Sequence, residues 1–590
     1  MARWTRNYTR GFRKSKGPSI RDHSRESALV FVGFLLVSVA RAVVGVRFSL
    51  ASIVPISIRK VGMIVDSRQA SRILFSSWFD MCEYFQGKVA AVARAHDWER
   101  IMNHQSRLPI SILVVIVMSL FAVDPASGQD WNPAERAELL DYARATWRSF
   151  DAMTDRNGLT SDHLQGNAQG EWKPSQLTSP TDIASYLWSV LAARSLDLID
   201  DAETDRRLRA TLTMLERMDR QNHFYYNLYD VKTGARVDQE KFRPSSAFLS
   251  SVDNAWLAVA LTMVRNARPE LRDRAETLVK PMDFGFFYVP FDPTNPLEHP
   301  GQFHGGYNTV ERQFTAFYGM LNTEPRIISY LALARKQVPA EHYYRMFRTL
   351  PVDRAPQSQR PQGVTRTYLG VPVFEGHYQF RELDLVPTWG GSMFEALMVP
   401  LFVPEETWAP RSWGINHPLY VRAQIEQGLI VRSYGAWGFS PSWTPEGGYQ
   451  TYGVADIGTE VDGYRTFELS QGDKPKRGKP TGPVFEGVVT AHASFLAMRY
   501  APRESLRNLR SLKQTYPMFT PTEGFHDSVN VTTGAVSHCV LSLDQGMILA
   551  AIANTLADDV MRKWLCDGSF EAAIRPLIEP EEFTAGDRRP

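Results

Sequence analysis

The sequence predicts an all-α fold in which paired helices close on themselves around one core. Three observations indicate this class. Apolar residues recur at helical spacing in several separate segments, alternating strand patterns are scarce, and residues 129–590 contain neither a fixed repeat period nor a low-complexity linker. We therefore expect one domain over 129–590, with long loops and a few short strands gathered at one mouth.

Four segments show the amphipathic pattern most clearly, with apolar residues three or four positions apart. In chain order these residues are Ile183, Leu187, Val190 and Leu191; Leu208, Leu212 and Leu215; Trp256, Leu257, Ala260, Leu261 and Val264; and Leu506, Leu509 and Leu512. The best strand candidates are the short runs 224–229 and 371–374.

The first 128 residues differ from the rest. Met102–Arg107 is polar and basic, Ile110–Val123 is strongly apolar, and Ala126–Gly128 supplies the small residues that a signal peptidase reads. This pattern predicts a signal peptide over 102–128, a mature chain that starts near Gln129, and a secreted or periplasmic protein. Residues 1–101 are then expected to be an upstream extension, disordered or absent in the natural protein. A membrane anchor at 110–123 is the alternative, but this run is short for a bilayer span.

Composition narrows the function classes. A net charge of +2 gives no reason to expect nucleic acid as a partner, and no membrane association is expected after signal cleavage. Aromatic residues make up 12% of the chain, and such side chains can form the stacking surfaces of a sugar-binding cleft. Three cysteines cannot form a disulfide framework; Cys539 and Cys566 either pair or remain two free buried thiols. The sequence does not specify an oligomeric state.

A carboxylate follows two glycines in the segment Trp389-Gly-Gly-Ser-Met-Phe-Glu395. Ser392 is a good helix N-cap, so Glu395 would occupy the third helical position, where a capping box places its carboxylate on the Ser392 amide. The other interpretation is a proton donor, because an aromatic wall from Trp389 and Phe394 would raise the pKa of Glu395 by desolvation.

Five blocks occur in a specific order. They are Leu177–Leu187, Tyr434–Pro441 with Gly447–Gly453, Val488–Ala497, Gly524–Asn530 and Leu541–Gly546. In this order they resemble the glucoamylase-like domain of secreted bacterial glycoside hydrolases, the group that contains endo-β-1,2-glucanases and is related to a domain of cyclic β-1,2-glucan synthases. The resemblance covers nearly all of residues 131–575.

This resemblance implies an (α/α)6 toroid with the active site in a central funnel, and an inverting glycoside hydrolase. By position, Glu395 matches an acid that is a candidate general acid in the glucanases. Asp253 matches an aspartate that follows a Ser-Ser-hydrophobic triplet, and we expect it to activate water or bind substrate. Its alternative role is a helix N-cap.

Further acids are candidates for the base. Glu375 lies in an extended segment where no helix end needs it, so it either faces the funnel or forms a salt bridge with Arg366. Asp462 lies in the acidic loop after Trp437, which also contains Glu446, Asp456 and Glu460. One acid of this loop is the base if the loop folds over the funnel; the others are expected to be solvated.

Substrate contacts are expected from polar and aromatic side chains of the same segments. The predicted residues are Asp182, Asn254, Arg366, Trp389, Trp413, Trp437, Tyr449, His492, Asp544 and Gln545. Asp182 and Asp544 are alternatively helix caps, and His492 is alternatively a core histidine. No His, Cys and Asp set has metal-ligand spacing, and no nucleophile elbow or phosphate loop occurs, so we expect neither a catalytic metal nor a cofactor.

Together these features predict a secreted glycoside hydrolase that cleaves a glucan, with β-1,2 linkage as the first candidate. Two alternatives stay open: a transglycosylase or glycosidase for another polysaccharide on the same scaffold, and a non-catalytic periplasmic glycan-binding protein.

Overall fold

Six apolar helices form the interior of the fold. The computed structural model describes residues 131–167, 169–237, 247–352, 357–459 and 486–589; the predictions for residues 1–128 and for Asp462 lie outside them. The inner helices are α6 (Pro180–Ser195), α8 (Ser251–Ala267), α10 (Arg326–Ala334), α12 (Met393–Leu397), α15 (Ala491–Ala497) and α17 (Ser542–Leu556). They are buried over nearly their whole circumference, as expected for helices that are apolar on all sides.

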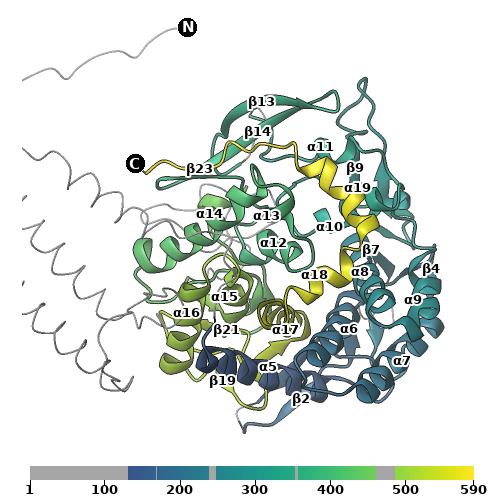
Figure 1. Ribbon diagram of the computed structural model, residues 1–590, viewed down its shortest axis with the longest axis vertical. Helices are drawn as coiled ribbons and strands as arrows, with labels where there is room; N and C mark the ends of the chain where they lie inside the picture. The colour runs from purple at the N-terminus through teal and green to yellow at the C-terminus, as the bar shows by residue number, and fades with distance from the viewer. Residues whose placement is uncertain (1–130, 168, 238–246, 353–356, 460–485, 590) are drawn as a thin grey trace, which may run out of the picture. The chain divides into compact units, whose positions relative to one another are not determined.

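The inner helices contact one another in chain order. Helix α8 packs against α6 and α10, α15 packs against α12 and α17, and α17 returns to pack against α6 (Figure 1). Between α10 and α12 the link is the Arg326 side chain, which is fully buried. Its guanidinium donates to the carbonyls of Glu395 (3.1 Å) and Ala396 (2.8 Å) and pairs with Glu405 at 2.7 Å.

A second set of helices covers the inner ones. Helices α5 (Pro133–Met153), α7 (Asp201–Arg217), α9 (Arg272–Val279), α14 (Trp413–Glu426), α16 (Pro502–Thr515) and α19 (Gly568–Ile578) contact α17, α6, α8, α12, α15 and α10 respectively. These helices include two of the predicted amphipathic segments. In α7, for example, Leu208, Leu212 and Leu215 are buried, whereas Arg206 and Arg209 are exposed. The remaining short helices are α11 (His342–Arg345), α13 (Glu405–Trp408) and α18 (Val560–Leu565).

Short strands collect where inner helices begin. Strands β3 (Leu177–Thr178), β7 (Phe248–Ser250), β18 (Val488–Thr490) and β22 (Cys539–Leu541) lead into α6, α8, α15 and α17, and pair antiparallel with β6 (Tyr229–Asp230), β10 (Gly306–Asn308), β21 (Ser528–Asn530) and β1 (His163–Gly166). The others are β2 (Trp172–Pro174), β4 (Arg220–Gln221), β5 (Phe224–Tyr225), β8 (Tyr288–Val289), β9 (Gln302–His304), β11 (Gln313–Phe314), β12 (Phe317–Tyr318), β16 (Ser442–Trp443), β17 (Tyr449–Gln450), β19 (Phe519–Thr520), β20 (Gly524–Phe525) and β23 (Gly586–Asp587).

The fold is predominantly helical, but it holds more strand than the sequence predicts. The strand candidate at 371–374 extends into β14 (Val371–Phe380), which pairs with β13 (Gln362–Tyr368) and β15 (Leu383–Leu385). The candidate at 224–229 divides into β5 and β6, which pair with different strands. Two-residue strands carry too little alternation to be recognised from sequence.

Two further findings concern the chain as a whole. Cys539 and Cys566 are both free thiols, which decides between the two alternatives for them. Among the helices of the described residues, none combines the length and the apolar character that crossing a bilayer requires.

Candidate active site

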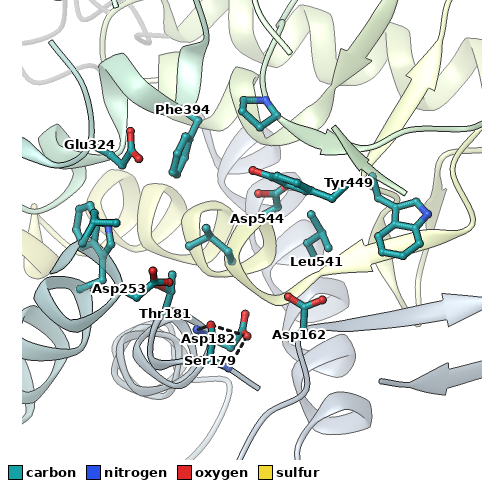
Figure 2. Close-up of a pocket in the computed structure, with 15 residues that line it drawn as sticks. Asp162, Ser179, Thr181, Asp182, Asp253, Glu324, Phe394, Tyr449, Leu541 and Asp544 are labelled. Carbon is teal, nitrogen blue, oxygen red and sulfur yellow. Dashed lines mark hydrogen bonds between the residues drawn. The ribbon is translucent and has the colours of Figure 1, made fainter. Parts of the chain in front are cut away.

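A cavity of about 320 Å³ opens where inner helices α6, α8 and α17 begin (Figure 2). Five carboxylates line it: Asp162, Asp182, Asp253, Glu324 and Asp544. The remaining lining residues are Ser179, Thr181, Val252, Trp256, Phe394, Pro441, Trp443, Tyr449, Leu541 and Leu543. Several acids facing an aromatic wall in one cavity is the arrangement that acid–base cleavage of a glycoside needs.

Helix starts place three of these acids. Asp182, Asp253 and Asp544 each occupy the third position of their helix, α6, α8 and α17. At that position a side chain lies beside the unpaired amides of the first turn, and the positive end of the helix dipole stabilises its negative charge. The same local pattern, repeated in three segments, therefore directs three carboxylates to one end of the fold.

The carboxylate of Asp182 is fully engaged. One oxygen accepts from the amide and the hydroxyl of Ser179, each at 2.8 Å, and the other accepts from the Ser542 hydroxyl at 2.6 Å. Burial, with a smaller contribution from the negative charge of Asp162, raises the pKa of Asp182 to about 8. The capping-box alternative for this residue is thus present, although Asp182 also lines the cavity.

Asp253 is not the N-cap of its helix. Ser250 fills that role by accepting from the Asp253 amide at 3.2 Å, which leaves the Asp253 carboxylate free of the cap. The carboxylate accepts a hydrogen bond from the Thr181 hydroxyl at 2.5 Å and lines the cavity. The alternative role of Asp253 as a helix N-cap is therefore wrong, because Ser250 accepts the capping hydrogen bond.

Glu324 is a cavity residue that sequence reasoning missed. It precedes Pro325 and helix α10, and no described side chain donates a hydrogen bond to its carboxylate. Burial, together with the negative charge of Glu395, raises the pKa of Glu324 to about 8. One local signal was available: an acid directly before a proline that begins an apolar helical run.

Glu395 lies behind the cavity wall, not on it. Its carboxylate accepts from the Thr388 hydroxyl, the Gly390 amide and the Ser392 hydroxyl, each at 2.9 Å, and 2% of the residue is exposed. The capping box with Ser392 is present, and the neighbouring Phe394 lines the cavity instead. Burial raises the pKa of Glu395, and the donated hydrogen bonds oppose this effect. This geometry corrects the expectation of a substrate-facing acid.

Asp544 is backed by two buried side chains. Asp544, Asp527 and His492 each place a ligand-type atom within 4.8 Å of the other two. The Nδ1 atom of His492 lies 2.9 Å from an Asp544 oxygen, without hydrogen-bond alignment. Burial lowers the pKa of His492 to about 4 and raises that of Asp544 to about 7. Burial and the charge of Asp544 raise the pKa of Asp527 well above its usual range.

This trio can be read in two ways. One His nitrogen and two carboxylate oxygens could hold a cation such as zinc, so the inference from spacing alone that the chain contains no metal-ligand set is corrected. Alternatively, Asp527 is protonated and shares its proton with Asp544, since two adjacent buried carboxylates cannot both ionise cheaply. The start of α17 favours an anion at Asp544, which supports the second interpretation.

The aromatic wall consists of Phe394, Trp443 and Tyr449. Tyr449 was predicted, and its ring is about half exposed (52%) while its hydroxyl points into the cavity (Figure 2). Burial of that hydroxyl and the charges of Asp544 and Glu324 raise the pKa of Tyr449. Trp443 was not predicted from the sequence, although it lies two residues after the Tyr434–Pro441 block.

Other predicted aromatic contacts lie elsewhere. Trp437 and Trp413 are 1% and 0% exposed and belong to the hydrophobic core. Trp413 stacks on His417 at 4.9 Å. Trp389 is partly buried, is absent from the cavity lining, and accepts through its carbonyl from the Thr459 amide.

Four predicted polar residues do not line the cavity. Glu375 is buried 3.7 Å from Arg348, in a cluster that also contains Glu581. Arg366 is exposed and pairs with Glu582 at 3.3 Å, so the proposed Glu375–Arg366 bridge is wrong. The two amides hold backbone: Asn254 bonds the amide and carbonyl of Tyr225, and Gln545 donates to the Phe525 carbonyl. Of the loop acids, Glu446 and Asp456 are outside the lining, and Glu460 and Asp462 are outside the described residues.

Family models match two parts of the chain. Residues 318–565, which contain Glu324, Tyr449 and Asp544, match the family described as "Putative glucoamylase". Residues 318–565 are therefore similar to a glucoamylase-like domain. Residues 141–285, which contain Asp182 and Asp253, match a family described as "Protein of unknown function (DUF3131)".

A curated relative and several solved structures are similar to this chain. The cyclic β-(1,2)-glucan synthase NdvB of Rhizobium meliloti (strain 1021) is 27% identical over 592 residues, which are 77% of this chain but 18% of that protein. The chain therefore spans about a fifth of the length of this relative.

Among solved structures, the endo-β-1,2-glucanase from Chitinophaga pinensis has a TM-score of 0.55 at 14% identity, covering 75% of this chain and 98% of that one. A putative glucoamylase from Bacteroides fragilis has a TM-score of 0.55 at 17% identity, covering 77% and 98%. At these identities the likeness concerns the fold.

Proposed function

We propose that this protein is a secreted, inverting glycoside hydrolase that cleaves a β-1,2-linked glucan in the funnel of an (α/α)6 toroid. Six inner helices support the toroid: five of their six successive pairs are in direct contact, α10 and α12 are joined through Arg326, and each inner helix is covered by an outer helix. The five-carboxylate cavity with its aromatic wall supports the chemistry. The signal-peptide pattern at 102–128 supports export.

Glu324 is the general acid of this proposal, and the observation that carries it is the Glu324–Glu395 pair. Glu395 is buried and Glu324 is partly buried at the cavity, close enough for the charge of Glu395 to raise the pKa of Glu324. Glu395 accepts hydrogen bonds from Thr388, Gly390 and Ser392, whereas Glu324 receives none from a described side chain. Hydrogen-bond donors favour the ionised form, so Glu395 carries the charge and Glu324 keeps the proton. The capping carboxylate thus acts through Glu324 and is a positioning residue.

Asp544 is the base. In Figure 2 Glu324 and Asp253 lie at the left of the view and Asp544 lies near its centre, with Phe394 between Glu324 and Asp544. Asp182 has both oxygens occupied by hydrogen bonds, whereas Asp544 lines the cavity at the start of α17 and is backed by His492 and Asp527. A base with a pKa near 7 is matched to operation near neutral pH.

The reaction follows from these positions. Glu324 transfers its proton to the glycosidic oxygen as the bond from that oxygen to the anomeric carbon breaks. Water attacks the anomeric carbon from the opposite face and gives its proton to Asp544. The product has inverted configuration, Glu324 is left ionised and Asp544 protonated, and exchange with solvent restores both. Asp253 and Tyr449 are placed to bind sugar hydroxyls.

The β-1,2 linkage rests on the names of similar proteins: a cyclic β-1,2-glucan synthase and endo-β-1,2-glucanases. A transglycosylase is the second candidate, because the matched relative is a synthase of which this chain covers a small share. It differs from the hydrolase in passing the sugar to another sugar hydroxyl in place of water.

Incubation of the mature protein with a panel of linear glucans of different linkage, followed by chromatography, tests the proposal. The hydrolase shortens linear β-1,2-glucan and releases free oligosaccharides. Products longer than the substrate, or cyclic products, would support the transglycosylase. Binding without turnover would support a glycan-binding protein.

A further inference from the structure

A cluster of aromatic rings lies on β9–β12, outside the cavity described above. Phe314 is 41% exposed and Tyr318 is 39% exposed. The ring of His304 stacks against Phe314, with centroids 4.9 Å apart, and against Phe317 at 4.3 Å, both within about 20° of parallel. The three stacked rings of His304, Phe314 and Phe317, together with the exposed Tyr318 that follows Phe317 on β12, form what we call the aromatic platform.

Hydrogen bonds join the aromatic platform to the cavity wall. The hydroxyl of Ser251, the first residue of α8, donates to the carbonyl of His304 at 2.8 Å, and its amide donates to that of Gly305 at 3.1 Å. Asp253 follows two residues later on the same helical turn. Burial and the negative charges of Glu324 and Asp253 raise the pKa of the Tyr318 hydroxyl. The platform is therefore continuous with the side of the cavity that holds these two carboxylates.

The ligand chemistry follows from size and charge. A cavity of about 320 Å³ is at the small end of ligand sites (roughly 300–1,000 Å³), so a polymer bound there must continue across the rim. Exposed aromatic rings match the apolar face of a sugar ring. The adjacent carboxylates disfavour a polyanion, whereas a neutral glycan meets no such repulsion.

We propose that the aromatic platform is a distal binding site for the same glucan chain, which holds sugar units that extend beyond the cavity. This inference rests on the proposed function, since it requires a polymeric glycan in the cavity. It makes long chains better ligands than short ones.

Binding measured without turnover tests the inference separately from catalysis. The full mature protein carrying Glu324→Gln is titrated calorimetrically with linear β-1,2-glucan and with the β-1,2-linked disaccharide sophorose. Phe314→Ala and Tyr318→Ala are added singly to this background. The matched control is Phe291→Ala, because Phe291 is also an exposed phenylalanine (36%) but lines a different cavity against Arg345.

The inference predicts that each platform variant binds the polymer about 2- to 10-fold more weakly, the effect of one aromatic contact. Sophorose binding and the control variant should be unchanged. Equal losses for polymer and disaccharide, or polymer binding that matches the control, would overturn the inference. If the Glu324→Gln protein binds glucan but the wild type releases no product, the proposed hydrolase is refuted. The test of the aromatic platform is unaffected by that result, because it measures binding alone. If Phe314→Ala fails to fold, Phe314→Leu replaces it, since it removes the ring and keeps an apolar side chain.

Discussion

Replacing Glu324 by glutamine removes the proton that the proposed mechanism transfers, while preserving the size of the side chain. At pH 7 an ordinary glutamate, with a pKa near 4.5, is protonated in roughly one molecule in 300. With its pKa raised to about 8, Glu324 is protonated in about nine molecules in ten. The environment thus contributes about 300-fold, or about 3.4 kcal/mol, to the population of the proton donor. We expect Glu324→Gln to lose about 10²- to 10⁴-fold in kcat on glucan.

The assay combines two substrates with a pH series. A natural β-1,2-glucan needs protonation of its leaving oxygen, whereas an aryl glycoside with a good leaving group does not, so Glu324→Gln should retain most activity on the second. In the wild type, kcat/KM should fall below about pH 7 as Asp544 is protonated and above about pH 8 as Glu324 ionises. The alkaline fall should disappear in Glu324→Gln.

Two results would refute this reasoning. Near-wild-type turnover of glucan by Glu324→Gln would show that the proton comes from another group. Equal losses on both substrates would show that Glu324 binds or supports the site without donating a proton. The matched comparison is Glu395→Gln, in which the glutamine oxygen can keep the hydrogen bonds from Gly390 and Ser392.

Four further outcomes follow. Glu395→Gln should keep its turnover at pH 6. The pH above which its kcat/KM falls should drop by about one unit, because the neutral glutamine no longer raises the pKa of Glu324. An unchanged pH profile would contradict the electrostatic coupling of Glu324 and Glu395. Asp527→Ala removes a hydrogen bond to ionised Asp544, so the pH below which kcat/KM falls should rise by about one to two units. Asp527→Asn can still donate that hydrogen bond and should return this pH to the wild-type value. Equal pH profiles for the two variants would exclude Asp527 as a positioning residue for Asp544. Glu324 holds its proton more tightly in the folded state, where its pKa is about 8, than in the unfolded state, where it is about 4.5. The free energy of unfolding should therefore fall as pH rises from about 4.5 to 8, because the unfolded chain gains by ionising Glu324 and the folded one does not. Calorimetry should find Glu324→Gln more stable than wild type at pH 9 and not at pH 5. Secreted protein should begin at Gln129 or a close neighbour by N-terminal sequencing, and a retained 110–123 segment would contradict cleavage there.

The helices could be predicted from sequence because their pattern is local. Leu208, Leu212 and Leu215 are buried as their spacing indicates. Four of the five short blocks that carry the resemblance lie within residues 318–565, which the glucoamylase family model matches. The first block, Leu177–Leu187, lies within residues 141–285, which match the family of unknown function. Asp182, Asp253 and Asp544 were named from sequence because acids at helix starts are visible without the fold.

The identity of the acid could not be predicted by the same means. The pattern around Glu395 fits a capping box and a catalytic acid equally well, and only its four close donors and its burial behind Phe394 separate the two. Glu324 reaches the cavity because α10 packs between neighbours far away in sequence, and its raised pKa depends on Glu395, 71 positions later. His492, Asp527 and Asp544 likewise meet only through the packing of α15 against α17.

The central claim is that Glu324 protonates the leaving oxygen while water, activated by Asp544, attacks from the opposite face. The most direct test is time-resolved proton NMR of linear β-1,2-glucan mixed with the mature protein, which resolves the anomeric configuration of each new reducing end before mutarotation. We expect the α-anomer first in the wild type and no new reducing ends with Glu324→Gln. Initial release of the β-anomer, or no release from any glucan by the wild type, would contradict the account.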